Sequence, residues 1–221
     1  MKYFIIVIIV LVQYGCSKPA GIKKENILKD FTKEELEYFY EVAFYREFRP
    51  GSVPLFYWMR DVRVRLNDEY TQSDSLELVR IVKELNELID VIEIQIVEEN
   101  PNLEIHYLKL LDFYQFPRYQ PGNRGYFSIQ SGLFGLFPRG YVLIDKNQSP
   151  RIRNHLIREE LTQSLGLMND SWKYPESIFY HGWTNTTEFA DIDRKLIQLL
   201  YNYNLLYAMK SEDFKKLISS N

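Results

Sequence analysis

The sequence predicts an α+β fold in which a sheet packs on one central helix and the C-terminal part is mainly helical. The helix is predicted by apolar residues that recur at helical spacing within 151–165. The sheet is predicted by short upstream segments in which apolar residues alternate with polar ones or run together. Helical spacing returns after residue 189. With 221 residues, 46% of them hydrophobic, the chain is long enough for one well-cored domain.

The first predicted helix covers 31–48. Thr32 followed by Glu35 is the signature of a capping box, and several aromatic residues supply an apolar face. The sequence R-P-G that follows ends this helix. The next segment, 55–66, begins apolar and then alternates, which predicts a strand with one buried face.

A second helix is predicted over 76–89, with Ser73 or Asp74 as its N-terminal cap. Two strands follow, at 91–97 and 103–108, separated by a polar turn. The predicted buried stripe of this helix consists of Leu76, Val79, Val82, Leu85, Leu88 and Ile89.

The segment 112–139 differs from the rest in composition, because it contains four glycines, two Phe-Pro pairs and many aromatic residues. This predicts a long loop or a pair of bent edge strands, and long ordered loops in compact domains often have a function. Its aromatic side chains either line a groove for a peptide or a glycan or cover the edge of the sheet, and the sequence favours neither. A short buried strand is predicted next, at 141–145.

The central helix is predicted to stop at Gly166, since glycine commonly follows a helix in a left-handed conformation. Its buried stripe consists of Leu156, Ile157, Leu161 and Leu165. A second line of side chains advances by four residues and therefore lies on one face: His155, Glu159 and Gln163. The last two helices are predicted to begin near residue 189 and to cover 211–218.

The composition excludes one class of partner. The net charge of −3 and the mixing of acidic and basic residues argue against nucleic acid, which requires a clustered basic surface. Cys16 is the only cysteine, so the folded domain has no internal disulfide.

The N-terminus predicts an export signal. Lys2 precedes a short apolar run, and Cys16 after Gly15 resembles a bacterial lipoprotein acylation site, although Q-Y before the glycine departs from the usual pattern. The alternatives are a plain signal peptide and an uncleaved anchor. We therefore predict three parts: 1–16, a signal peptide with a lipoprotein-type Cys16; 17–26, a polar tether; and 27–221, a single domain. This organisation predicts a membrane-anchored lipoprotein of the bacterial cell envelope that faces the periplasm or the exterior.

Residues 159–170 read E-E-L-T-Q-S-L-G-L-M-N-D. They resemble the zinc-binding motif of metzincin metallopeptidases, the matrixin branch in particular, which reads H-E-x-x-H-x-x-G-x-x-H-D. Three residues match that motif in identity: Glu160, Gly166 and Asp170. At the positions of the three zinc-binding histidines stand Glu159, Gln163 and Asn169. The zinc motif is thus degenerate.

The resemblance continues on both sides. S-I-F-Y at 177–180 resembles the methionine-containing turn of matrixins, with Phe179 at the methionine position, and 191–201 resembles their following helix. With Trp58 and the strands after it, the resemblance covers about 55–201. It implies a zincin-like fold, in which a mixed twisted sheet packs on an active-site-type helix. The chain also resembles a bacterial envelope family in which E-E-x-x-Q-x-L-G-L-x-N-D and a following S-I-F replace the zinc motif.

In the active family, the glutamate at the position of Glu160 is the general base that activates zinc-bound water. The three ligand positions here offer only oxygen atoms, two of them from neutral amides, which is a poor set for zinc and a weak one for harder cations. We therefore expect no cofactor, with zinc or another divalent cation as the alternative. His155 and Glu159 lie one helical turn apart and can share a metal if His181 or His106 supplies a third ligand. Otherwise the three histidines are ordinary surface, turn or strand residues.

Without a metal, the motif is expected to form a hydrogen-bond network among Glu159, Gln163, Asn169 and Asp170, with Arg153 and Arg158 as further partners. The resemblance then implies a lipid-anchored, non-catalytic binding protein whose ligand is a peptide, a protein or a glycan. One alternative is a metal-dependent peptidase or hydrolase with a non-standard metal shell and Glu160 as general base. Another is a purely structural partner in an envelope complex.

Overall fold

The computed structural model describes residues 21–47, 50–130, 132, 138–182 and 184–219. The predicted signal peptide, Cys16 and most of the predicted tether lie outside these residues. The last three residues of the predicted tether begin a helix, α1 (Lys24–Asp30), which the sequence analysis did not predict. Among the described helices, none combines the length and the apolar character needed to span a membrane.

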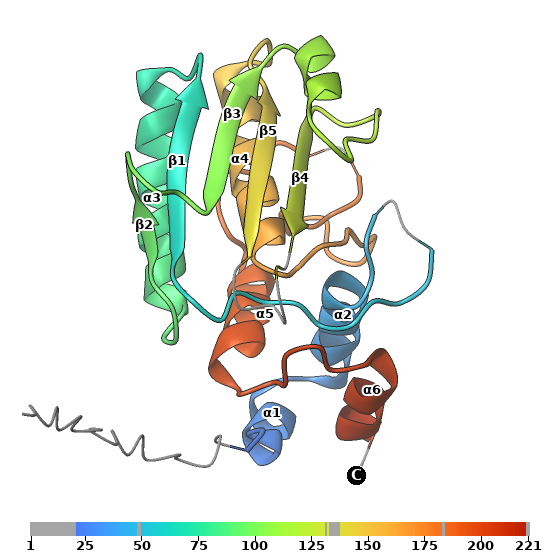
Figure 1. The fold of residues 1–221 in the computed structure, drawn as a ribbon. Helices are drawn as coiled ribbons and strands as arrows, with labels where there is room; N and C mark the ends of the chain where they lie inside the picture. Colours follow the sequence, from blue (N-terminus) through green and yellow to red (C-terminus); the bar gives the residue numbers. More distant parts are fainter. Residues whose placement is uncertain (1–20, 48–49, 131, 133–137, 183, 220–221) are drawn as a thin grey trace, which may run out of the picture.

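The described residues form a five-stranded mixed sheet in the order β2-β1-β3-β5-β4 (Figure 1). Four neighbouring strands run parallel, and β4 pairs antiparallel with β5 at one edge. The predicted α+β class and the mixed sheet are confirmed. The strands are β1 (Val62–Asp68), β2 (Ile94–Ile96), β3 (Leu103–Leu108), β4 (Gly125–Gln130) and β5 (Arg139–Asp145).

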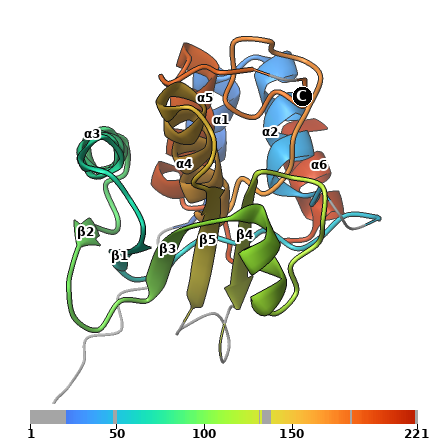
Figure 2. The same cartoon turned by 90° about the horizontal axis from the view of Figure 1, so that it is seen from above.

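The helices gather on one side of the sheet, as the view from above shows (Figure 2). The central helix α4 packs directly on β4 and β5, with α3 beside it. The remaining helices lie beyond α4, toward the end where both termini of the described chain emerge. The helices after α1 are α2 (Lys33–Ala43), α3 (Gln72–Leu88), α4 (Pro150–Ser164), α5 (Asp191–Asn202) and α6 (Ser211–Ser219).

Several predicted boundaries are wrong. The capping box of Thr32 and Glu35 is present, but α2 ends at Ala43 instead of residue 48. The segment 55–61 is not part of β1, and β2 is shorter than the predicted strand at 91–97. The cap of α3 is Thr71, whose side chain accepts from the backbone N–H of Asp74, so neither Ser73 nor Asp74 is the cap.

The buried stripe of α3 also differs from the prediction. Leu76 and Val79 are 62% and 52% exposed, whereas the carboxyl-bearing residues Asp74 and Glu77 are buried beside the apolar stripe. The reason lies on the facing helix, because α4 presents two arginines to this side of α3. Arg153 donates to Asp74 at 2.9 Å, and Arg158 donates to Glu77 at 3.2 Å.

The aromatic residues within 112–139 have two roles. A short 3-10 helix, η1 (Leu110–Gln115), lies on the side of the sheet opposite α4 (Figure 2). Near it, rings from this segment pack against strand residues: the centroids of Tyr119 and Tyr126 are 5.3 Å apart in an edge-to-face contact, and those of Phe116 and Tyr141 are 5.0 Å apart and tilted. The aromatics therefore cover a face of the sheet, while β4 forms an edge strand of the described sheet and borders a cavity described below.

The C-terminal end of α4 is fastened by two distant aromatic side chains. The last carbonyls of a helix have no partner within the helix, so other groups must satisfy them. The indole N–H of Trp58 donates to the carbonyl oxygen of Ser164, and the hydroxyl of Tyr201 donates to that of Leu165, both at 2.9 Å. Gly166 follows with φ +134°, which confirms the predicted glycine at this turn.

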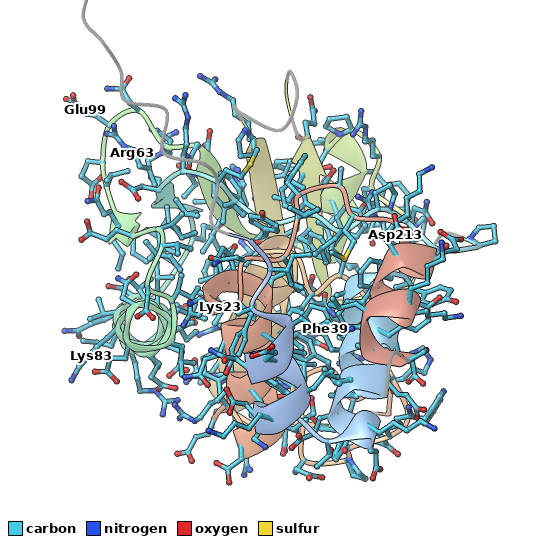
Figure 3. All side chains as sticks on the ribbon, turned by 90° about the horizontal axis from the view of Figure 1, so that it is seen from below. Lys23, Phe39, Arg63, Lys83, Glu99 and Asp213 are labelled. Atoms are coloured by element: carbon cyan, nitrogen blue, oxygen red, sulfur yellow. The ribbon has the colours of Figure 1, made fainter. Side chains whose placement is uncertain are left out.

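A second aromatic cluster fills the space between α2 and α6. The ring centroids of Phe39 and Phe214 lie 5.2 Å apart, and both side chains are fully buried. Phe39 lies inside the molecule in Figure 3, whereas Lys83 and Glu99 lie at its rim. Helices α2 and α6 are thus joined by the same core that supports α4.

Candidate functional site

Side chains from α4 and from three loops line a cavity of about 290 Å³ beside β4. Four of them carry carboxyl groups, and we call this cavity the acidic pocket. The carboxyl groups belong to Glu47, Glu159, Glu160 and Asp170, and other lining residues are Asn123, Arg124, Gly125, His155, Gln163 and His181. The predicted line of His155, Glu159 and Gln163 therefore faces one cavity, as its four-residue spacing requires.

His155 and Glu159 form an ion pair along the helix. The Nε2 atom of His155 lies 3.3 Å from a carboxylate oxygen of Glu159, and its Nδ1 atom bonds to the carbonyl oxygen of Thr186 at 2.8 Å. Burial alone would lower the pKa of His155, but the hydrogen bond and the charge of Glu159 outweigh it and raise the pKa. Both ring nitrogens are therefore occupied, and His155 holds Glu159 in place.

Gln163 connects α4 to the turn that follows it. Its side-chain amide donates to a carboxyl oxygen of Asp170 at 2.7 Å. The other oxygen of Asp170 lies 3.8 Å from Nδ1 of His181, which is 45% exposed at the mouth of the pocket. The predicted hydrogen-bond network is thus present for Gln163 and Asp170.

Glu160 lies against the backbone of β4. A Cβ atom built on Gly125 would lie 2.3 Å from a carboxyl oxygen of Glu160, so the Glu160 side chain can keep this position only beside a glycine. Glu160 is 6% exposed. Among the residues that the structure describes, no donor within hydrogen-bonding distance of its carboxyl group is found.

Glu47 reaches the same cavity from the loop after α2. The side-chain amide of Asn123 donates to it at 2.9 Å. Burial raises the pKa of Glu47, the Asn123 hydrogen bond lowers it, and the charge of Glu159 raises it again, so that the pKa lies above its usual value.

The two remaining carboxyl groups show the same effect more strongly. Burial, followed by the charges of Glu159 and Glu47, raises the pKa of Glu160 well above its usual value. The same causes, in the same order, raise the pKa of Asp170 to about 9, and the hydrogen bond from Gln163 offsets only part of this. The pocket thus holds more carboxyl groups than its neighbouring cations could compensate if all of them were ionised, and the raised pKa values keep some of these groups protonated.

The raised pKa of Asp170 predicts how stability changes with pH. A carboxyl group with a folded-state pKa of about 9 stays protonated in the folded chain while it ionises in the unfolded chain above pH 4. Its contribution to stability is therefore fully present below pH 4 and is lost as the pH rises to about 9, by at most about 1.4 kcal/mol per pH unit. We expect Asp170→Asn to increase the free energy of unfolding at pH 7 and to flatten its pH dependence.

Urea denaturation at pH values between 4 and 9 measures both quantities. Asp90→Asn is the control, because Asp90 is exposed and lies outside the pocket. If Asp170→Asn had the same pH slope as the wild-type protein, the assignment of a neutral Asp170 would be wrong.

Two other motif residues, Asn169 and Phe179, make structural contacts and do not line the acidic pocket. The side-chain amide of Asn169 donates to the carbonyl oxygen of Glu41 at 3.1 Å, so Asn169 binds the turn to α2 and is not part of the pocket lining. Phe179 is fully buried in the core. Its turn is fixed by Ser177, whose hydroxyl accepts from Tyr38 at 2.7 Å and from the backbone N–H of Phe179 at 3.0 Å.

The arginines predicted to bond to the motif residues, and one predicted metal ligand, lie outside the acidic pocket. Arg153 and Arg158 were expected to join the network of the motif, but they pair with Asp74, Glu77 and Glu84 on α3, so that expectation is wrong. His106 was considered as a third metal ligand. It lies within β3 and bonds at 2.6 Å to Asp68, the last residue of β1, and it is not among the residues that line the acidic pocket.

The residues present do not fit the zinc ion that the resemblance implies. Catalytic zinc is held by three protein ligands, most of them imidazoles. Here Glu159 is engaged by His155, the amide nitrogen of Gln163 faces Asp170, and Asn169 bonds to backbone carbonyls. These positions neither converge nor offer the required donors.

A second cavity, of about 200 Å³, adjoins the acidic pocket and follows β4. The two cavities share Glu47, Asn123, Gly125 and Glu160 in their linings. On the far side from the acidic pocket, the second cavity is lined by Tyr126–Ile129 of β4 and by Arg118 and Gln120. A groove therefore runs from the acidic pocket along the sheet edge.

Glu47, Asn123 and Gly125 were not predicted as site residues from the sequence. Glu47 and Asn123 come from loops whose composition gives no sign that they meet α4. Gly125 was detectable in principle, because a glycine within a strand often marks a close approach of another group. Here that group is the candidate catalytic carboxyl of Glu160.

The comparisons with known proteins identify one family and two similar solved structures. A family model described as "Protein of unknown function (DUF2927)" matches residues 32–220. No curated protein matches the chain. A solved structure described as "Crystal structure of myroilysin" is similar with a TM-score of 0.47 and 12% identity, over 73% of this chain and 92% of that one. A second, described as "Structure of Myroilysin", has a TM-score of 0.39 and 12% identity, over 66% and 81%.

Proposed function

We propose that this chain, which belongs to the DUF2927 family, is a binding protein that takes up an extended polypeptide segment along β4. The observation that carries the proposal is the position of this strand. β4 pairs only with β5 among the described strands, so its outer side is an edge of the described sheet. Such an edge presents backbone N–H and C=O groups to which a further strand can bond.

The groove beside β4 supports the same ligand class. Side chains of an added strand point alternately to the two faces of the sheet, so they need space beside the edge strand. The second cavity supplies that space along Tyr126–Ile129, and it continues into the acidic pocket at Gly125. A polypeptide on β4 would therefore have backbone partners and side-chain subsites together.

The motif residues favour binding over cleavage. The positions that hold zinc in metzincins carry Glu159, Gln163 and Asn169, and the last of these faces away from the groove. A polypeptide on β4 would lie beside carboxyl and amide groups that bond to one another. We infer that the domain keeps a peptide groove of the metzincin type without its hydrolytic centre.

The N-terminal sequence supports a location for this binding activity. We propose that acylation at Cys16 anchors the domain to a bacterial membrane through a short tether, with the groove facing the periplasm or the exterior. The test is a Cys16→Ser variant, which we expect to lose labelling by a palmitate analogue and to leave the membrane fraction.

Binding along β4 is tested with peptides selected from a random display library on the purified protein. We expect selected peptides to slow hydrogen exchange of the β4 backbone amides, and N-methylation of alternate peptide residues to abolish binding because it removes strand hydrogen bonds. Protection of a different surface, or binding that tolerates every N-methylation, would contradict the proposal.

A second candidate, a hydrolase with Glu160 as general base, is favoured by one observation: Glu160 lines both cavities. Hydrolysis of a selected peptide by the wild-type protein but not by Glu160→Gln would establish it. We expect neither protein to hydrolyse the peptides that it binds.

A further inference from the structure

The acidic pocket contains four carboxyl groups, more than its cationic lining residues can pair with, and the packing of the fold does not require them there. Glu159 and Glu160 project from α4, Asp170 from the turn after it, and Glu47 from the loop after α2. Three separate segments therefore bring carboxyl groups to one cavity, although ionising several neighbouring carboxyl groups in a partly buried site is unfavourable.

The positive groups in the lining are largely engaged. His155 bonds to Glu159 and to the carbonyl oxygen of Thr186. Arg124 donates to the side chain of Gln148 at 2.6 Å. His181 stands 3.8 Å from Asp170 at the mouth of the pocket. These contacts serve Glu159 and Asp170 but supply no donor to Glu160.

Glu160 is an independent indication that the pocket takes a ligand. It is 94% buried (6% exposed), its carboxyl group lines the cavity, and no described residue donates to it. A buried carboxyl group without a donor is destabilising, so a fold that merely needed to fill this position would use an apolar residue. Gly125 makes room for this carboxyl, so strand and helix are matched to each other here.

The ligand can be placed relative to β4. Glu160 and Gly125 lie where the two cavities meet, at the first residue of the strand. A polypeptide paired with β4 would reach this point with one of its side chains, since every second side chain of a strand points to the same face. That side chain would enter the acidic pocket.

We propose that the acidic pocket is a specificity site for a basic side chain, arginine or lysine, of the polypeptide that binds along β4. This inference rests on the proposed function. A guanidinium group presents five N–H donors and an ammonium group three, so either can donate to several carboxyl groups at once. Charge-assisted hydrogen bonds of this kind are about twice as strong as neutral ones.

The first experiment tests binding to the acidic pocket with single amino-acid probes, in the absence of any peptide on β4. N-acetyl-arginine amide and N-acetyl-lysine amide are titrated against the purified protein in the presence of a chelator, followed by NMR or by thermal shift. N-acetyl-citrulline amide is the control, because it has nearly the shape of the arginine probe but no charge. We expect binding of at least one basic probe that is about tenfold or more tighter than citrulline, and loss of that preference in a Glu160→Gln, Asp170→Asn double variant.

Glu87→Gln is the matched protein control, because Glu87 is an exposed carboxylate on α3 outside the pocket. It should leave the preference unchanged. Equal binding of citrulline and of the basic probes, or a preference that survives in the double variant, would overturn the inference. Comparison of the arginine and lysine probes shows which of the two groups the pocket takes.

The second experiment separates this inference from the proposed function. Peptides that protect β4 from exchange are compared with versions in which each basic residue is replaced in turn by citrulline or glutamine. We expect one position to require a positive charge, and the double variant to lose that requirement while β4 remains protected. Peptides that protect β4 without any such position would overturn the specificity site and leave the proposed function intact. A basic probe that binds the pocket when no peptide protects β4 would overturn the proposed function.

Discussion

Arg158→Met is expected to lower the free energy of unfolding at pH 7 by about 3–5 kcal/mol, the usual cost of breaking a buried ion pair by removing one partner. Arg158 is fully buried between α3 and α4. Its guanidinium donates to Glu84 at 2.9 Å and to Glu77 at 3.2 Å, and it lies 4.4 Å from the ring centre of Phe189. Methionine keeps much of the volume but none of these donors. Chemical denaturation measures the change.

Arg80→Met is the matched control. Arg80 also binds Glu77, through a 2.8 Å contact, but its side chain is 41% exposed. An ion pair that includes an exposed side chain contributes only about 0–1 kcal/mol. Both substitutions therefore remove a guanidinium group from Glu77, but Arg158 is buried and also binds Glu84, whereas Arg80 is partly exposed and also binds the carbonyl oxygen of Thr187. Equal losses of stability would contradict the role assigned to Arg158.

At the contact between α3 and α4, the sequence predicted the helix but not which of its side chains are buried. Helical spacing correctly predicted α3, but the buried stripe was assigned to apolar residues such as Leu76 and Val79, which are exposed. Asp74 was predicted only as a possible helix cap, and Glu77 was left out of the buried stripe, because carboxylates are seldom buried without a partner. Their partners are Arg153 and Arg158, about eighty residues later in the chain. No local pattern links these positions.

In the acidic pocket, too, some residues could be predicted from the sequence and others could not. The four-residue spacing of His155, Glu159 and Gln163 was sufficient to place them on one face of α4. In the structure, all three side chains line the acidic pocket. The positions of Glu47 and Asn123 depend on loops, whose course sequence spacing does not determine. Asn169 shows the reverse case: its motif position suggested the pocket, but the turn directs its amide to Glu41.

The glycine at the end of α4 was the most predictable part of the motif, and the structure adds a reason beyond its backbone conformation. A Cβ atom at Gly166 would lie 2.1 Å from the carbonyl oxygen of Phe56 and 3.1 Å from a methyl group of Leu200. That carbonyl cannot easily withdraw, because the neighbouring Leu55 bonds through both its N–H and its C=O to the segment before α6. The helix end therefore meets the chain before β1 with no space for a side chain.

Gly166→Ala should consequently combine two penalties: about 1–3 kcal/mol for φ in a region that favours glycine, and about 1–3 kcal/mol for overpacking. Gly51→Ala is the control, because Gly51 also has positive φ, at +81°, but nothing lies within 4 Å of its Cβ position. It should show the conformational penalty alone. The free energy of unfolding of both variants measures the difference, which is the steric part. If the two substitutions were equally destabilising, the close contact between Gly166 and Phe56 would not be what requires glycine at the end of α4.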